Sequence, residues 1–251
     1  MKAGSRRALI AALSCVLVIS VGMVIYKTAQ YRAGGQSYAA AEKLAEAGES
    51  APPSAAPTPQ LPEEVKNIDL TALKKINPDV AGWLCIPGTG ISYPLVYSAA
   101  KENTYYLTHT WEDKYNQVGA IFIDPANSPD LTDFNTVIYG HNMKDGSMFG
   151  TLSRYGDENW LGQHPDIYLL NENGACRYRI FAAYETAVDS DAYLIGFSDI
   201  KSKQDYIRFC LESSAADAGV IPTAEESIIT LSTCTGAGHA TRWVIQAAAE
   251  K

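Results

Sequence analysis

The sequence predicts a mainly β-sheet domain with added helices, its strands arranged as a closed or nearly closed barrel, behind an apolar N-terminal segment. From Val80 onward, short runs rich in β-branched and aromatic residues are separated by Gly, Pro, Asn and Asp. Many short strands with regular turn signals are typical of barrels. The first sixty or so residues have a different composition, which leaves a length suited to one domain with its own core.

The N-terminus predicts a single membrane-spanning helix. Residues 8–26 carry no charge, whereas Arg6 and Arg7 precede them and Lys27 follows. At about 1.5 Å per residue this stretch just spans a hydrocarbon core of roughly 30 Å. The positive residues place residues 1–7 in the cytoplasm and the rest of the chain outside the cell. A cleaved signal peptide is the alternative, because residues 37–41 resemble a cleavage site, but its apolar region is normally only about 7–15 residues long.

Residues 27–60 are expected to form an extracellular linker, and residues 61–251 the catalytic domain. The linker is rich in Ala, Gly, Ser and Pro. Its residues 50–59 contain too many prolines for a regular helix and predict an extended spacer. Residues 39–48 have the composition of a short helix.

The domain begins with a helical segment over residues 61–76, where Leu70, Leu73 and Ile76 have helical spacing. Strands are predicted over residues 83–86, 93–96, 120–124, 135–139, 166–170, 177–184, 227–233 and 241–246. Between the sixth and seventh strands, residues 199–212 predict a helix. Its apolar face would consist of Ile200, Tyr206, Ile207, Cys210 and Leu211.

Charge and cysteine content exclude several classes of function. The formal net charge is −8 and no basic stripe occurs, which argues against nucleic acid as a partner. Cys85, Cys176 and Cys210 have apolar neighbours and are expected to be buried thiols, while Cys15 lies in the apolar segment. No Cys-x-x-Cys or His-x-x-x-His pair occurs, so no metal site and no cofactor are expected.

One group of residues has the chemistry for acyl transfer. Cys234 ends one predicted strand and Arg242 begins the next, and the glycine-containing loop between them predicts a hairpin that sets the two side by side. His141 follows the strand over residues 135–139. A nearby cation favours the thiolate, and an imidazole can exchange protons with a leaving group. His239, in the hairpin loop, is the rival base, but a Gly-flanked loop would hold its ring poorly, which favours His141.

These residues resemble a class B sortase. The resemblance runs from about Ile76 to Ala248, and its motifs occur in the family's order. They are residues 82–94, Tyr105-Tyr-Leu-Thr-His109, Gly119-Ala-Ile-Phe-Ile-Asp124, residues 141–149 beginning His-Asn-Met, and Thr230-Leu-Ser-Thr-Cys234. The resemblance implies the eight-stranded sortase barrel, with an N-terminal helical segment and the class B helix between strands six and seven.

The resemblance also implies a reaction. Cys234 would attack the Thr carbonyl of a C-terminal sorting motif on a secreted protein, Arg242 would hold the oxyanion, and His141 would protonate the departing amine. The thioacyl enzyme would then pass the protein to an amine of a peptidoglycan precursor or crossbridge. The residues of the substrate groove would be Asn103, Leu107, Tyr193 and Ser232.

Alternatives in other classes remain open at this point. A thiol peptidase would use the same thioacyl intermediate with water as acceptor. A pilus-polymerising sortase would use an amine of another surface protein. A surface scaffold without activity would require the Cys, His and Arg arrangement to be a coincidence.

Overall fold

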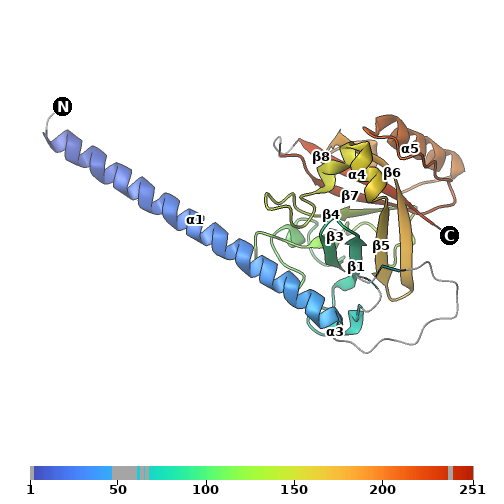
Figure 1. The fold of residues 1–251 in the computed structure, drawn as a ribbon, viewed down its shortest axis with the longest axis horizontal. Helices are drawn as coiled ribbons and strands as arrows, with labels where there is room; N and C mark the ends of the chain where they lie inside the picture. The colour runs from blue at the N-terminus through green and yellow to red at the C-terminus, as the bar shows by residue number, and fades with distance from the viewer. Residues whose placement is uncertain (1–2, 47–60, 63–64, 66–67, 237–239, 251) are drawn as a thin grey trace.

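A computed structural model describes residues 3–46, 61–62, 65, 68–236 and 240–250. Eight strands close into a barrel, as predicted (Figure 1), and neighbouring strands follow the order β1-β2-β3-β4-β7-β8-β6-β5. The strands are β1 (Val80–Ile86), β2 (Ile91–Val96), β3 (Ile121–Ile123), β4 (Asn135–Tyr139), β5 (Asp166–Asn171), β6 (Gly174–Ala187), β7 (Ile228–Cys234) and β8 (Thr241–Ala249).

Strand β7 lies between β4 and β8. It runs parallel to β4, with Tyr139 opposite Ser232, and antiparallel to β8, with Cys234 opposite Arg242. Every residue of β7 except Cys234 is buried, in keeping with its β-branched composition. Strand β6 is longer than predicted, because its first half pairs with β5 and its second half with β8.

Helix α5 (Ile200–Ser213) covers the outside of the barrel, as expected from the pattern over residues 199–212. Asp199 caps it by accepting a hydrogen bond from the backbone N–H of Ser202. Tyr206, Ile207 and Cys210 are buried in a separate apolar cluster with residues of β6 and β8. Ile200 is 66% exposed, so the expected apolar face is wrong at this position, which is the first residue of the helix.

The other helices are short. Of the helix expected over residues 61–76, the described residues include α3 (Leu70–Lys74), which Asp69 caps at the backbone N–H of Ala72. Helix α4 (Glu158–Gln163) was not expected, although Asp157 caps it in the same manner. The 3₁₀ turns are η1 (Tyr105–Leu107), η2 (Leu152–Gly156) and η3 (Asp191–Tyr193).

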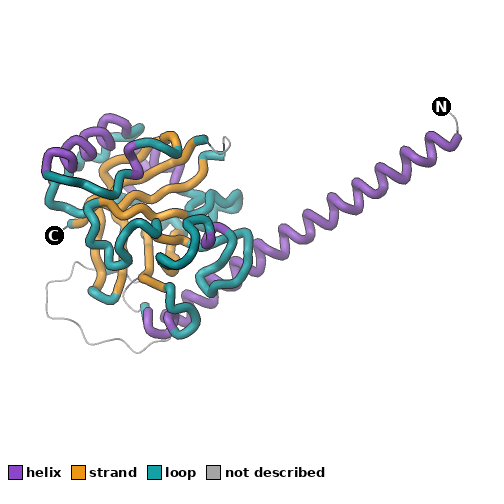
Figure 2. The backbone as a smooth tube through the Cα atoms, turned by 180° about the vertical axis from the view of Figure 1, so that it is seen from behind, coloured by secondary structure: helices purple, strands orange, loops and turns teal. Residues whose placement is uncertain are grey.

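Helix α1 (Ala3–Glu46) is one continuous element whose N-terminal half projects away from the barrel (Figures 1 and 2). By length and composition it can cross a membrane, a property that a signal sequence shares. The helix continues through residues 27–46, the first part of the expected linker, and so extends well beyond the short helix expected over residues 39–48. The proline-rich spacer over 50–59 lies outside the described residues.

The C-terminal half of α1 is packed against the barrel. Gly34, Tyr38, Ala41 and Ala45 lie three or four residues apart, hence on one helix face, and all are buried. A Cβ at Gly34 would lie 2.7 Å from Cγ2 of Val118, so only glycine allows the helix this close. This contact outweighs the cost of about 1 kcal/mol for glycine within a helix.

Two N-terminal deletions test this packing. Removing residues 1–27 should leave the free energy of unfolding unchanged, since the side chains of residues 10–27 are exposed and lie outside the buried face of α1. Removing residues 1–46 should lower it by at least about 3 kcal/mol, because the buried Tyr38 is lost with its neighbours. Denaturant unfolding of the two soluble proteins measures the difference. Equal midpoints and slopes would contradict the packing of α1.

Candidate active site

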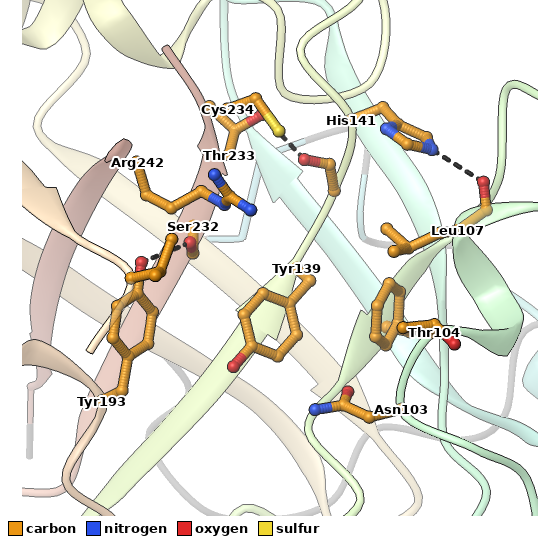
Figure 3. A pocket seen from close by; sticks show the side chains of 13 residues that line it. Asn103, Thr104, Leu107, Tyr139, His141, Tyr193, Ser232, Thr233, Cys234 and Arg242 are labelled. Atoms are coloured by element: carbon orange, nitrogen blue, oxygen red, sulfur yellow. Dashed lines mark hydrogen bonds between the residues drawn. The ribbon is translucent and has the colours of Figure 1, made fainter. Parts of the chain in front are cut away.

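The ends of β4, β7 and β8 surround a pocket of about 380 Å³ (Figure 3). It is lined by Asn103, Thr104, Leu107, Phe122, Tyr139, Gly140, His141, Val188, Tyr193, Ser232, Thr233, Cys234 and Arg242. All seven residues that the sequence nominated for catalysis and substrate binding are among them. The barrel therefore brings together side chains that are up to about 140 residues apart in sequence.

Cys234 and Arg242 are neighbours across the β7–β8 pair. Side chains directly opposite each other in antiparallel strands point to the same face, so the thiol and the guanidinium share the pocket. Ser232, two residues before Cys234, points to that face as well. Both Cys234 and Arg242 are half-exposed, which leaves them open to a ligand. The arrangement matches the predicted hairpin.

His141 is held on the opposite side of Cys234 from Arg242 (Figure 3). Its Nε2 lies 2.7 Å from the backbone oxygen of Leu107. A carbonyl can only accept, so Nε2 must carry the proton of this bond. The other ring nitrogen, Nδ1, lies on the Cys234 side (Figure 3). Proton exchange with the pocket therefore belongs to Nδ1.

The loop after β4, which carries His141, is attached to the end of β7 by three hydrogen bonds. The side-chain amide of Asn142 donates to the backbone oxygen of Cys234 at 2.6 Å. The hydroxyl of Thr233 donates to the oxygen of Gly140 at 2.7 Å, and the N–H of Gly140 donates to Ser232 O at 3.1 Å. The imidazole and the thiol are thus held on segments that cannot separate without breaking these bonds.

The remaining pocket walls are aromatic and polar. The Tyr193 hydroxyl lies 2.9 Å from Oγ of Ser232, and its ring stacks with that of Tyr139 at 6.4 Å between centroids. Burial raises the pKa of Tyr193, so the phenol stays neutral and can donate a hydrogen bond. Burial, with the nearby carboxylate of Asp124, also raises the pKa of Tyr139, whose hydroxyl donates to Asp124 at 3.0 Å.

Asn103 and Leu107 form the wall opposite Tyr193 (Figure 3). The side-chain amide of Asn103 lies 3.3 Å from Oδ2 of Asp124, the same atom that accepts from Tyr139. Leu107 has two functions, because its side chain lines the pocket while its carbonyl orients His141.

Two residues that shape the site, Asn142 and Tyr139, were not identified from the sequence. Asn142 was part of a quoted motif, but nothing in the sequence indicates that its amide reaches Cys234. Tyr139 was noted only as the end of a strand, although that position and its adjacency to His141 are a usable signal. The rival base, His239, lies outside the described residues.

Among the residues that the structure describes, the other histidines and cysteines do not line the pocket. His109 and His164 are half-buried, and Nδ1 of His164 lies 3.0 Å from the backbone oxygen of Pro87. Cys85 and Cys210 are buried as expected. Cys176 was also expected to be buried, but it is only half-buried. Its segment of β6 pairs with β5 near the end of the barrel.

Comparison with known proteins identifies relatives of this architecture. Residues 84–250 match the family model described as the sortase domain. Sortase B of Listeria monocytogenes is 40% identical over 168 residues, which are 66% of this chain and 67% of that protein. The structure of sortase B from B. anthracis in complex with AAEK1 is similar with a TM-score of 0.76 and 28% identity, covering 89% of this chain and 99% of that one. A Staphylococcus aureus sortase B–substrate complex has a TM-score of 0.68 and 30% identity, covering 72% and 84%.

Alkylation tests whether Cys234 is the accessible thiol of the barrel. Burial raises the pKa of Cys210 to about 12, so near pH 8 it remains almost entirely protonated as well as inaccessible. Burial also raises the pKa of Cys176. Brief treatment with iodoacetamide followed by peptide mapping should label Cys234 before Cys85, Cys176 and Cys210. Labelling of Cys210 at the same rate would contradict the described packing. In the protein without residues 1–27, which also lacks the exposed Cys15, Cys234→Ala is the control that should remove the fast phase.

Proposed function

Since this chain belongs to the sortase family, with class B sortases among its relatives, we propose that it is a membrane-anchored transpeptidase that joins secreted proteins to the cell wall. The substrate is a protein with a C-terminal sorting motif, cleaved after Thr. The acceptor is an amine of a peptidoglycan precursor or crossbridge. The observation that carries the proposal is the single pocket in which Cys234, His141 and Arg242 meet.

In the first step the Cys234 thiolate attacks the carbonyl carbon of the Thr residue. A C–S bond forms and the carbonyl oxygen becomes an oxyanion. Arg242 offers a planar set of N–H donors with a permanent positive charge, which suits an oxyanion that develops beside the attacked carbon. Its position directly across the strand pair from Cys234 supports this role.

His141 supplies the proton for the leaving group. Collapse of the oxyanion breaks the C–N bond, and an amine leaves readily only when it is protonated. With Nε2–H donated to Leu107 O, the proton comes from Nδ1 of the imidazolium. The products of this half-reaction are the thioacyl enzyme and a free C-terminal peptide.

The second half-reaction reverses the proton flow. The acceptor amine gives a proton to Nδ1 of His141 as its nitrogen attacks the thioester carbon. The new C–N bond forms, the C–S bond breaks, and Cys234 returns to the thiolate. Asn103, Leu107, Tyr193 and Ser232 are proposed to hold the sorting motif, because they form the two walls that lead to the thiol.

Helix α1 supports a site close to the membrane. If residues 8–26 span the bilayer with the N-terminus inside, the same continuous helix runs from Lys27 to the docked Tyr38. That distance is roughly 16 Å at 1.5 Å per residue. A helix of this length without a flexible linker would keep the pocket near lipid-linked cell-wall precursors.

The reaction is tested by supplying a panel of sorting peptides with and without an amine such as triglycine. Peptides of the Asn-Pro-x-Thr and Ser/Pro-Pro-x-Thr-Gly types are the first choices, since class B relatives favour them. The wild-type protein should form the transfer product when the amine is present. Cys234→Ala should form neither cleaved nor transferred product while keeping its unfolding midpoint. If the peptide is cleaved to the same extent with and without the amine and no transfer product forms, water is the acceptor and the protein is a thiol peptidase.

A second variant separates the geometry of Arg242 from its charge. Arg242→Lys keeps the positive charge but loses the planar donor array, so peptide turnover should fall on the order of 10²–10³, the effect of losing an oxyanion-hole donor. Alkylation of Cys234 should proceed at nearly the wild-type rate, because an ammonium still stabilises the thiolate. If this variant turns over peptide at the wild-type rate, the planar donor array is not needed and Arg242 contributes only its positive charge.

A further inference from the structure

Helix α1 contacts Gly119, a residue that packs against the imidazole ring of His141. The hydroxyl of Tyr38 donates to the backbone oxygen of Gly119 at 2.5 Å, and this bond is buried. Gly119 has φ of +66°. A Cβ at this position would lie 2.9 Å from the oxygen of Leu107 and 3.0 Å from Cδ2 of His141. The peptide that Tyr38 holds is therefore in contact with both the ring and the carbonyl that orients it.

Neighbouring bonds fix this peptide in one position. The N–H of Ala120 donates to Tyr106 O at 2.8 Å, which ties the Gly119 segment to the 3₁₀ turn that ends at Leu107. The N–H of Gly119 donates to the oxygen of Asn116 at 3.1 Å. Asn116 in turn donates its side-chain amide to the oxygen of Gln30 in α1 at 3.0 Å. A displacement of α1 would therefore move the Leu107 carbonyl.

A second contact reaches the other side of the His141 loop. The ring of Tyr38 meets that of Tyr93 edge-on, with 5.2 Å between centroids. The Tyr93 hydroxyl accepts the N–H of Met148 at 3.0 Å, at a residue with φ of +54°. The next residue, Phe149, donates its N–H to the oxygen of His141 at 2.9 Å. Helix α1 thus supports the loop of His141 from both directions.

We propose that Tyr38 is a positioning residue for His141, through which the docked half of the membrane-proximal helix keeps the imidazole aligned for proton transfer. Tyr38 does not line the pocket and acts through Gly119 and the Leu107 carbonyl. Burial raises the pKa of Tyr38, so the phenol stays protonated and can donate this hydrogen bond. This inference rests on the proposed function of His141 as the proton donor to the leaving amine.

The test compares two substrates in the full-length chain in detergent. One peptide carries an ordinary amide after Thr, whose nitrogen needs a proton to leave. The other ends in a p-nitrophenyl ester of Thr, whose leaving group needs none. Tyr38→Phe removes only the hydroxyl and leaves the ring against Tyr93. In this variant the rate of thioacyl formation from the amide peptide should fall about fivefold, the factor expected for the loss of one hydrogen bond. KM for the amide peptide and the rate of reaction with the ester peptide should not change.

Tyr155→Phe is the matched control. Tyr155 is fully buried and donates to the backbone oxygen of His164 at 2.9 Å, the same type of bond away from the pocket. This variant should keep both rates within about twofold of wild type. If Tyr38→Phe leaves the amide rate unchanged, or lowers both rates equally, the positioning role is wrong.

His141→Ala distinguishes failure of this inference from failure of the proposed function. If that variant loses the amide reaction and retains the ester reaction while Tyr38→Phe shows no such selectivity, only the role of Tyr38 is overturned. If His141→Ala lowers both reactions equally, His141 is not the proton donor and both proposals fail.

Discussion

The pairing of β7 with β4 on one side and β8 on the other is the constraint on which the pocket depends. Its parallel register with β4 places the His141 loop beside the end of β7, and its antiparallel register with β8 places Arg242 opposite Cys234. Hydrogen bonds from the Asn142 side chain to the oxygen of Cys234, and from the Thr233 hydroxyl to the oxygen of Gly140, then join the His141 loop to β7. Three reactive groups meet because a single buried strand has fixed neighbours, and a slip of one residue would turn the thiol to the other face.

The sequence predicted the strands because short apolar runs bounded by turn residues have few other interpretations. The strand ends and the glycine-containing hairpin also predicted that Cys234 and Arg242 would be neighbours, as the pairing of β7 with β8 shows, whereas Asn103, Leu107, Tyr193 and Ser232 were expected only from the family resemblance. The sequence missed the continuation of α1, because two adjacent glycines and small residues indicate a linker. The packing of Gly34 on Val118 overrides that local preference. Asn142 was missed because its role depends on a contact across the barrel.

Helix α1 gives the N-terminal segment a structural role beyond its apolar stretch. Its docked half is part of the core through Tyr38, Ala41 and Ala45. The same helix therefore includes the candidate membrane span and a buried face. Tyr38 on that face donates a hydrogen bond to Gly119, beside His141. If residues 8–26 span a membrane, the same helix determines both the position of the barrel relative to that membrane and the support of the imidazole.

The proposed acyl transfer proceeds through a thioester on Cys234. Incubating the protein with a sorting peptide in the absence of an amine, followed by rapid acid quenching, preserves any covalent intermediate. Intact-mass and peptide mass spectrometry then locate it. We expect an adduct with the mass of the peptide up to its Thr, attached to Cys234 and removed by added amine with formation of the transfer product. An adduct on another residue, or turnover with no covalent intermediate, would contradict it.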